Sequence, residues 1–489
     1  MRSRFQAIGR PRLQVGGVAR SLVVVGGATA IGQGALVLAA PVLARLYDPQ
    51  AFGLLSLYAA ILSVLLAGSS LRYDFAVPIA GDPVEAIHLL GLSMVIAVAA
   101  SLVVAVVVIV WGSPLSALLG AAPLAPFLWL LPIGLVVSSV AQAMTSWAVY
   151  HRLFSRIGRL RATQGIGQAV SQAALGITRV GPIGLILGDI TGRVLGTEQI
   201  FRPLLVELRS TRITAKAVRR YARERWGFAR VMTAASLLNA LSLQVPFLLI
   251  PAFFDLESSG QYFLAFRVLV LPASLVAAAV SQVFFGEASL RRGDTRRLHD
   301  LARNAAVSLF VFSIPTYITV IVAGPALIDA VFGSRWAPAG LYAQVMAPGL
   351  ILWSVASPIS TLLLVGRRER ESLAFTAVEL AMKTGALLCG ALVHSLIVGL
   401  VVLTAVTVMI NIAALWRFLR VASVSLRELV RPCGRILAMT LPWMGLVVIV
   451  GAIAPEGVAV AVVLAWAVAF GLAARLSPET RALMSDEHD

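Results

Sequence analysis

Charged residues are scarce in this chain of 489 residues. Asp, Glu, Lys and Arg make up 13% of it, whereas a soluble domain carries about 25% charge. Apolar residues supply 59%, in runs of about 20 residues that recur from residue 22 to residue 474. A soluble core would not absorb so much apolar sequence, so the natural solvent of this chain is lipid. Because barrel strands show short alternating segments, the runs predict transmembrane helices.

Residues that hold metals or nucleotides are also rare. The two cysteines and five histidines show no spacing typical of metal ligands or of a disulfide framework. The sequence contains neither a G-x-x-x-x-G-K-[ST] loop nor an H-E-x-x-H motif. No loop on the expected outer side is long enough for a catalytic domain. We therefore expect no cofactor and no metal, and a transporter rather than an enzyme.

The apolar runs predict fourteen spans. They are residues 20–46, 51–72, 84–111, 124–150, 163–178, 181–201, 228–252, 258–286, 303–328, 338–366, 371–393, 395–416, 435–453 and 457–475. The fifth is rich in small and semi-polar residues, which suits a helix packed among other helices.

The charges that are present are mostly positive, with a net charge of +17. Because the positive residues cluster between the apolar runs, they indicate cytoplasmic loops rather than a surface that binds nucleic acid. With the N-terminus in the cytoplasm, 34 of the 40 Lys and Arg residues fall on the cytoplasmic side of the fourteen-span topology. We expect a multi-pass protein of the inner (cytoplasmic) membrane with both termini in the cytoplasm.

The chain contains an internal repeat. Residues 47–61 (YDPQAFGLLSLYAAI) and 254–268 (FDLESSGQYFLAFRV) align without gaps at an offset of 207. Each begins the second span of a six-helix unit, and an even number of spans makes the two units parallel. The expected organisation is a basic tail 1–19, a first lobe 20–201, a basic linker 202–227, a second lobe 228–416, a basic loop 417–434, a helix pair 435–475 and a tail 476–489.

Several segments together resemble a known family. They include Leu43–Gly53 at the first outer turn, Arg72–Pro78 after the second span, and Tyr262–Pro272 in the eighth. The chain resembles oligosaccharide flippases of the polysaccharide biosynthesis family, in the multidrug/oligosaccharidyl-lipid/polysaccharide (MOP) exporter superfamily. The resemblance implies an all-α, V-shaped fold of two lobes around a cavity that opens alternately to each face. It also implies a glycan on a polyprenyl diphosphate as cargo, with a polysaccharide polymerase and glycosyltransferases as partners besides the membrane lipids.

Three alternatives stay open. A flippase for the lipid-linked peptidoglycan precursor shares the span count, but no cation lies between Arg20 and Arg45 in the first helix. A multidrug or cation exporter of the superfamily is disfavoured because the first two spans carry no acid before Asp48. A membrane-embedded glycosyltransferase or polymerase is disfavoured by the short outer loops.

Charged residues inside spans are the candidate site residues, because each costs about 3 kcal/mol at a helix centre. Arginine binds phosphate oxygens with two parallel hydrogen bonds, so Arg267 is the first candidate substrate ligand. Lys383 is a second, and Arg20 and Arg72 form a possible cytoplasmic portal. The candidate ion-coupling acids are Glu379, Asp74 and Asp189.

Each candidate also has a structural interpretation. The spacing of four residues predicts internal ion pairs for Glu379 with Lys383 and for Asp189 with Arg193. Arg20 and Arg72 also fit as anchors at the membrane surface. Polar side chains within the spans are suited to sugar hydroxyls or to bonds between helices: Gln33, Gln142, Gln168, Gln172, Asn239, Gln244, Gln282 and Asn411.

Overall fold

The computed structural model describes residues 15–270, 295–359 and 369–453. In these ranges the chain is almost entirely helical and contains no strand, which confirms the predicted all-α class. Nine helices of the described part are long and apolar enough to cross a membrane. The last predicted span, 457–475, lies outside the described residues, as do parts of the spans 258–286 and 338–366.

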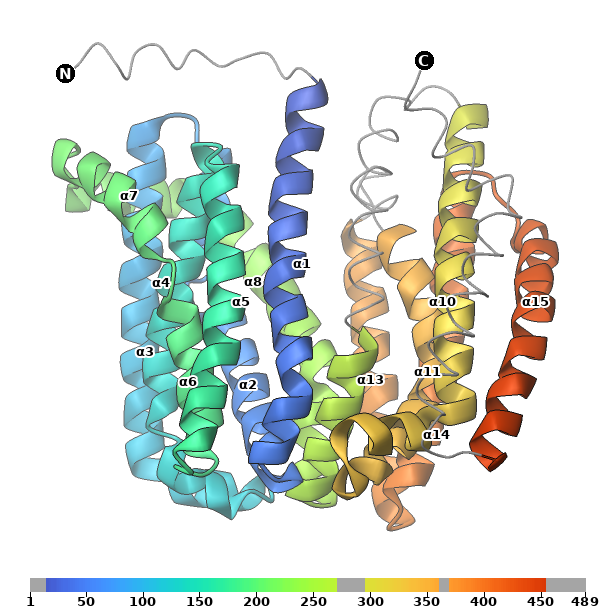
Figure 1. The fold of residues 1–489 in the computed structure, drawn as a ribbon. Helices are drawn as coiled ribbons and strands as arrows, with labels where there is room; N and C mark the ends of the chain where they lie inside the picture. Colours follow the sequence, from blue (N-terminus) through green and yellow to red (C-terminus); the bar gives the residue numbers. More distant parts are fainter. Residues whose placement is uncertain (1–14, 271–294, 360–368, 454–489) are drawn as a thin grey trace.

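The helices form two bundles, which occupy the left and right sides of Figure 1. The first bundle contains α1 (Val15–Leu46), α2 (Pro49–Ser69), η2 (Tyr73–Ile79), α3 (Pro83–Leu118), η3 (Ala122–Phe127), α4 (Leu130–Tyr150), α5 (Phe154–Ile177), α6 (Ile183–Val194) and α7 (Glu198–Ser210). The second contains the helical residues 256–270 and α10 (Thr295–Phe332), η4 (Ser334–Trp336), α11 (Ala337–Ile359), α13 (Glu369–Leu392), α14 (Leu396–Val421) and α15 (Leu426–Ile453).

The long helix α8 (Ala215–Phe253) joins the bundles and packs against α2 and α3 of the first and α13 of the second. We call the end of the molecule where α1 begins the upper end, and the end where α1 turns into α2 the lower end (Figure 1). With these terms α2 and α8 run in opposite directions, and the segment 256–270 rises from the lower end beside α2.

Local signals in the sequence set the helix starts at both ends of the molecule. At the lower end, Asp48 caps α2 by accepting a hydrogen bond of 2.7 Å from the backbone N–H of Ala51, and Pro49 occupies the first turn. At the upper end, Asp82 caps α3 through the N–H of Glu85 at 2.7 Å. These caps satisfy backbone donors that lipid would leave without partners.

Two predicted boundaries in the first bundle were wrong. The sequence placed Arg156, Arg159 and Arg161 in a loop, but α5 begins at Phe154 and includes all three. The predicted span 181–201 is broken, because α6 ends at Val194 and Gly196 adopts a left-handed φ of 81°. At 1.5 Å per residue, the 12 residues of α6 reach about 18 Å, well short of a hydrocarbon core of about 30 Å.

The fifth helix is packed among others, as its composition predicted. α5 lies between α1 and α6, where small residues bring the backbones together. A Cβ atom at Gly188 or Gly192 of α6 would come within 3.0 Å of the backbone of Gln172 or Gln168 on α5. This close packing brings the glutamine side chains of α5 to the carboxylate of α6 described below.

Candidate functional site

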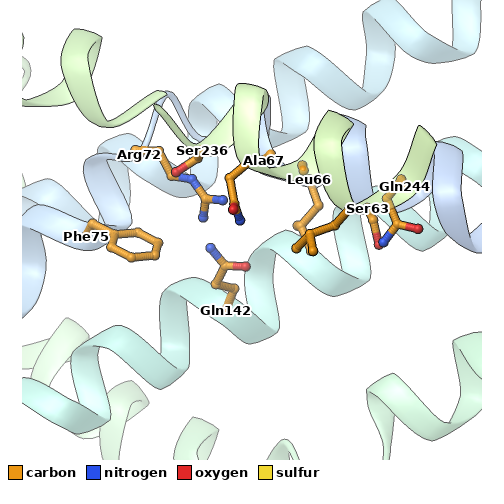
Figure 2. Close-up of a pocket in the computed structure, with 11 residues that line it drawn as sticks. Ser63, Leu66, Ala67, Arg72, Phe75, Gln142, Ser236 and Gln244 are labelled. Atoms are coloured by element: carbon orange, nitrogen blue, oxygen red, sulfur yellow. The ribbon is translucent and has the colours of Figure 1, made fainter. Parts of the chain in front are cut away.

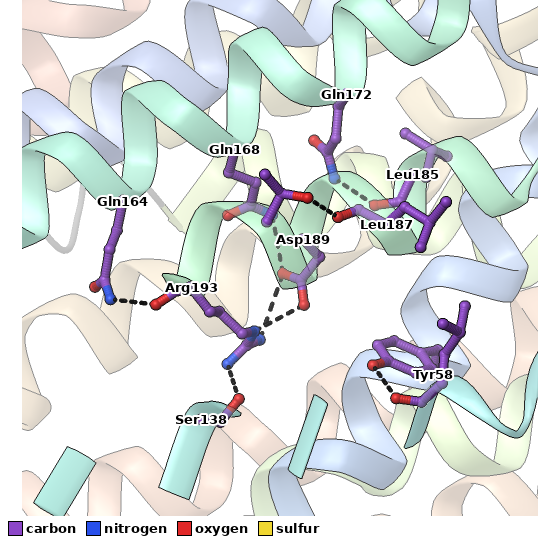
Figure 3. Close-up of polar contacts among 11 residues, drawn as sticks. Tyr58, Ser138, Gln164, Gln168, Gln172, Leu185, Leu187, Asp189 and Arg193 are labelled. Carbon is purple, nitrogen blue, oxygen red and sulfur yellow. Dashed lines mark hydrogen bonds and ion pairs between the residues drawn. The ribbon is translucent and has the colours of Figure 1, made fainter. Parts of the chain in front are cut away.

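An ion pair predicted from spacing forms on α6, inside the first bundle. Arg193 donates from Nε to Oδ2 of Asp189 at 2.8 Å, and Asp189 Oδ1 accepts from Gln168 Nε2 at 3.0 Å. Arg193 also donates from Nη1 to the hydroxyl of Ser138 on α4 at 3.2 Å. Figure 3 shows these contacts converging from α4, α5 and α6. The pair is satisfied within its own bundle, which favours the structural interpretation of Asp189.

Arg267 is different, because no acid of the described residues pairs with it. It is half-buried on the helical segment 256–270, and it forms no hydrogen bond or ion pair within the described ranges. Its guanidinium lies 5.9 Å from the ring centre of Phe263 on the same helix. An unpaired cation this deep in a membrane protein costs several kcal/mol. An ion pair between helices, the alternative to a substrate ligand for Arg267, does not form within the described ranges.

Lys383 and Glu379 form the second predicted pair. Nζ of Lys383 lies 2.6 Å from Oε1 of Glu379 on α13, and it also approaches the backbone oxygen of Ser242 on α8 at 3.5 Å. Both side chains are largely buried. The pair neutralises itself and links α13 to α8, so its geometry favours a structural role.

The upper half of the molecule contains a cavity of about 430 Å³ between α2, η2, α4 and α8. We call it the upper cavity. Its lining residues are Ser63, Leu66, Ala67, Arg72, Phe75, Gln142, Ser236, Asn239, Ala240, Leu243 and Gln244. Figure 2 shows the guanidinium of Arg72 and the amide of Gln142 pointing toward one another, with Ser63 and Gln244 at the other end. Side chains from both the first bundle and α8 therefore face one space.

Arg72 is held over the upper cavity by a strained turn. Leu71 and Arg72 both have left-handed backbones, with φ of 47° and 57°, a conformation that costs about 1–3 kcal/mol for residues other than glycine. Next to the turn, buried Asp74 accepts from Ser70 Oγ and from Gln142 Nε2, each at 2.6 Å. The bond from Gln142 fixes the turn to α4. Arg72 itself forms no ion pair within the described ranges.

The guanidinium of Arg72 retains binding capacity. Its Nε is buried and has no hydrogen-bond partner, while the group as a whole lies 4.6 Å from the ring centre of Phe75. Strain, an unsatisfied donor and a cavity thus coincide at this residue. Arg20, the other arginine of the predicted portal, lies in α1, but its side chain lies outside the described part of the structure.

At the lower end the two copies of the internal repeat contact each other. Gly53 on α2 and Gly260 in the segment 256–270 are aligned positions of the repeat. A Cβ atom at Gly53 would overlap the carbonyl oxygen of Leu256, and one at Gly260 would overlap that of Pro49. Position 256 is the repeat partner of position 49, so the two overlaps are symmetry-related.

The contacts around the two glycines follow the same symmetry. Ser56 and Ser259 share a hydrogen bond of 3.0 Å, and the ring centres of Phe52 and Phe263 lie 6.5 Å apart. Positions 52 and 259 are equivalent in the repeat, and so are positions 56 and 263. In both contacts, the first of these positions in one copy faces the second in the other copy. We call this contact, which centres on Gly53 and Gly260, the lower seam.

Trp336 of η4 reinforces the lower seam. It is fully buried, packs edge-on against Phe52 at 5.0 Å, and donates from Nε1 to the backbone oxygen of Ala44 on α1 at 3.0 Å. The two bundles are therefore tightly joined at the lower end, whereas the upper cavity lies between the first bundle and α8 nearer the upper end.

The whole fold is similar to solved MOP-superfamily structures. The chain superposes on "Lipid II flippase MurJ, inward closed conformation" with a TM-score of 0.71 at 13% identity, over 93% of this chain and 99% of that one. It superposes on an inward-facing multidrug resistance MATE family transporter with a TM-score of 0.64 at 13% identity, over 83% and 98%. These likenesses establish the class: a polytopic all-α membrane protein with the MOP fold.

The family follows from the sequence. Residues 42–340 match the family described as polysaccharide biosynthesis protein, and this chain belongs to it, which confirms the resemblance. It is 26% identical over 183 residues to the teichuronic acid biosynthesis protein TuaB of Bacillus subtilis (strain 168), over 35% of this chain and 38% of TuaB. It is 23% identical over 163 residues to the lipopolysaccharide biosynthesis protein WzxC of Escherichia coli (strain K12), over 33% of each. The alignments thus span little more than a third of these relatives.

Proposed function

We propose that this protein is a flippase that moves a polyprenyl-diphosphate-linked oligosaccharide across the cytoplasmic membrane for the synthesis of an exported polysaccharide. The observation that carries the proposal is Arg267, a cation on the membrane helix 256–270 that has no ion-pair partner within the described ranges. A diphosphate is a dense anion, and a guanidinium out of bulk water binds its oxygens with charge-assisted hydrogen bonds. No acid in the described ranges pairs with Arg267, so its charge is available to the cargo.

The positive charges of the loops orient the molecule in this proposal, with the upper end facing the cytoplasm. Arg72 then lies at the depth where the carrier's diphosphate meets the protein, while Arg267 lies deeper, on the helix that rises from the lower seam. In this orientation the lower seam closes the outer side of the described conformation. Transport requires the seam to separate and the upper ends to close.

The charge pattern favours a lipid-linked glycan over a drug or cation as cargo. The three candidate coupling acids are already engaged: Asp189 with Arg193, Glu379 with Lys383, and Asp74 with Ser70 and Gln142. Among the candidate residues, those without an ion pair in the described ranges, Arg72 and Arg267, are both cations. A site with free cations and occupied acids suits an anion. A peptidoglycan precursor carries the same diphosphate, so the fold likeness to a lipid II flippase keeps that cargo as the second candidate.

Deletion of the gene tests the proposal. We expect the complete lipid-linked repeat unit to accumulate on the cytoplasmic face while surface polymer disappears, because earlier enzymes continue to build a cargo that no longer crosses. The measurement is extraction of the polyprenyl-diphosphate glycans, with mass analysis and probing of their sidedness. Truncated glycans would instead indicate an enzyme, and normal lipid-linked pools with altered drug tolerance would indicate an exporter.

A further inference from the structure

The upper cavity contains more neutral hydrogen-bonding groups than a diphosphate needs. Besides Arg72, its lining carries three amides and two hydroxyls: Gln142, Asn239, Gln244, Ser63 and Ser236. Apart from Gln142, whose Nε2 is bound to Asp74, none of these side chains forms a hydrogen bond within the described chain. Amides and hydroxyls each donate and accept, so together they form an uncharged surface that matches a hydroxyl-rich ligand.

The arrangement of these groups follows from helix periodicity. Ser236, Asn239, Leu243 and Gln244 share one face of α8, at spacings of three, four, seven and eight residues. Ser63 lies on the facing surface of α2 with Leu66 and Ala67. Arg72 and Gln142 close the upper side. A ligand in this cavity therefore contacts the first bundle through its anion and α8 through its neutral polar groups.

The size of the cavity limits what it holds. A volume of about 430 Å³ lies toward the lower end of the range of sites for single small molecules, about 300–1,000 Å³. It accommodates a sugar ring with its linkage rather than a complete oligosaccharide. The remainder of a longer glycan would extend beyond the cavity.

We infer that the upper cavity recognises the sugar attached directly to the diphosphate, with Asn239 and Gln244 of α8 as specificity-determining residues. This inference rests on the proposed function. Arg72 binds diphosphate oxygens, as the unsatisfied Nε–H allows, and the amides pair with hydroxyls of the first sugar. Such a site rejects a sugar whose hydroxyl or acylamino group points elsewhere, because the mismatched polar groups would be left without partners. Recognition would therefore depend on the innermost sugar rather than on the outer repeat unit.

Binding of short water-soluble carriers to the purified protein tests this inference. The ligands are geranyl diphosphate and a panel of geranyl-diphosphate monosaccharides that differ in one hydroxyl or acylamino group. The variants are Asn239→Leu, Gln244→Leu and Arg72→Ala. Asn411→Leu is the matched control, because Asn411 lies on α14 and does not line the cavity, and its side chain donates to the backbone oxygen of Thr407 on its own helix. Calorimetry gives the dissociation constants.

We expect at least one sugar of the panel to tighten wild-type binding about tenfold over geranyl diphosphate, the effect of one or two hydrogen bonds. Asn239→Leu and Gln244→Leu should remove this gain and leave the affinity for geranyl diphosphate within about twofold. Arg72→Ala should weaken all ligands by a similar factor, and Asn411→Leu should change none.

The outcomes separate this inference from the proposed function. Wild-type binding that is indifferent to the sugar, or amide variants that retain the sugar gain, would overturn the sugar site and leave the flippase proposal intact. Amide variants that weaken geranyl diphosphate as much as the sugar-bearing ligands would also overturn it. Failure of the wild type to bind any geranyl diphosphate compound would overturn both.

Discussion

Replacement of Arg267 by alanine is expected to stop glycan export while the protein still inserts into the membrane. Arg267 lies on a helix of the second bundle, and no acid of the described chain neutralises it. Truncation of one partner of a buried charge pair costs about 2–5 kcal/mol, which corresponds to a loss on the order of 30-fold or more. Removal of an unpaired cation relieves a desolvation cost in the empty protein, so folding should not suffer.

Two further variants make this result specific to the guanidinium. Arg267→Lys keeps the charge but loses the two-pronged geometry, and we expect partial export. Arg335→Ala removes an exposed cation at the lower end, and we expect full export. The measurement is surface polymer per unit of membrane-inserted protein. Normal export by Arg267→Ala at equal protein levels would remove Arg267 from the substrate path.

A disulfide across the lower seam is expected to arrest transport reversibly. The hydroxyl oxygens of Ser56 and Ser259 lie 3.0 Å apart on helices of different bundles. In a background with Cys389 and Cys433 replaced by alanine, Ser56→Cys/Ser259→Cys should form a bond on oxidation, because two sulfurs at these positions approach disulfide geometry. If the seam must open in each cycle, oxidation stops export and a reductant restores it.

The second bundle offers a matched control for the cross-link. The hydroxyls of Ser313 on α10 and Ser354 on α11 lie 2.6 Å apart within one bundle. A disulfide from Ser313→Cys/Ser354→Cys should form equally well and leave export unchanged, because helices of one bundle move together. Export that continues through a fully formed Ser56→Cys/Ser259→Cys cross-link would show that the lower seam does not open during transport.

The sequence predicted those features of the fold that depend on neighbouring residues. Hydropathy identified the nine helices of the described part that are long and apolar enough to cross a membrane. Spacings of four residues identified the pairs Asp189–Arg193 and Glu379–Lys383, because both partners share a helix face. The lobe boundaries themselves stay a prediction. The break after α6 escaped detection, because Leu195 and Gly196 lie within an apolar run, and the helix ends only through the extended backbone of Leu195 and the positive φ of Gly196.

The parts of the candidate site that the sequence did not predict depend on distant contacts. The upper cavity combines residues from α2, α4 and α8, and no spacing along the chain relates Gln142 to Asn239. The strained turn at Leu71 and Arg72 contains no glycine that would mark it. The repeat aligned Gly53 with Gly260, but alignment gives equivalent positions and not contact. The contact between the two glycines at the lower seam is seen only in the packed structure.

The central claim is that this chain moves a lipid-linked glycan across a bilayer by means of Arg267. Reconstitution of the purified protein in vesicles tests it most directly, with a fluorescent short-chain polyprenyl-diphosphate oligosaccharide and a membrane-impermeant quencher. We expect wild-type vesicles to expose label from the inner leaflet to the quencher, and vesicles with Arg267→Ala to behave like vesicles without protein. Equal quenching in wild-type and protein-free vesicles, across glycans from the native pool, would contradict the claim.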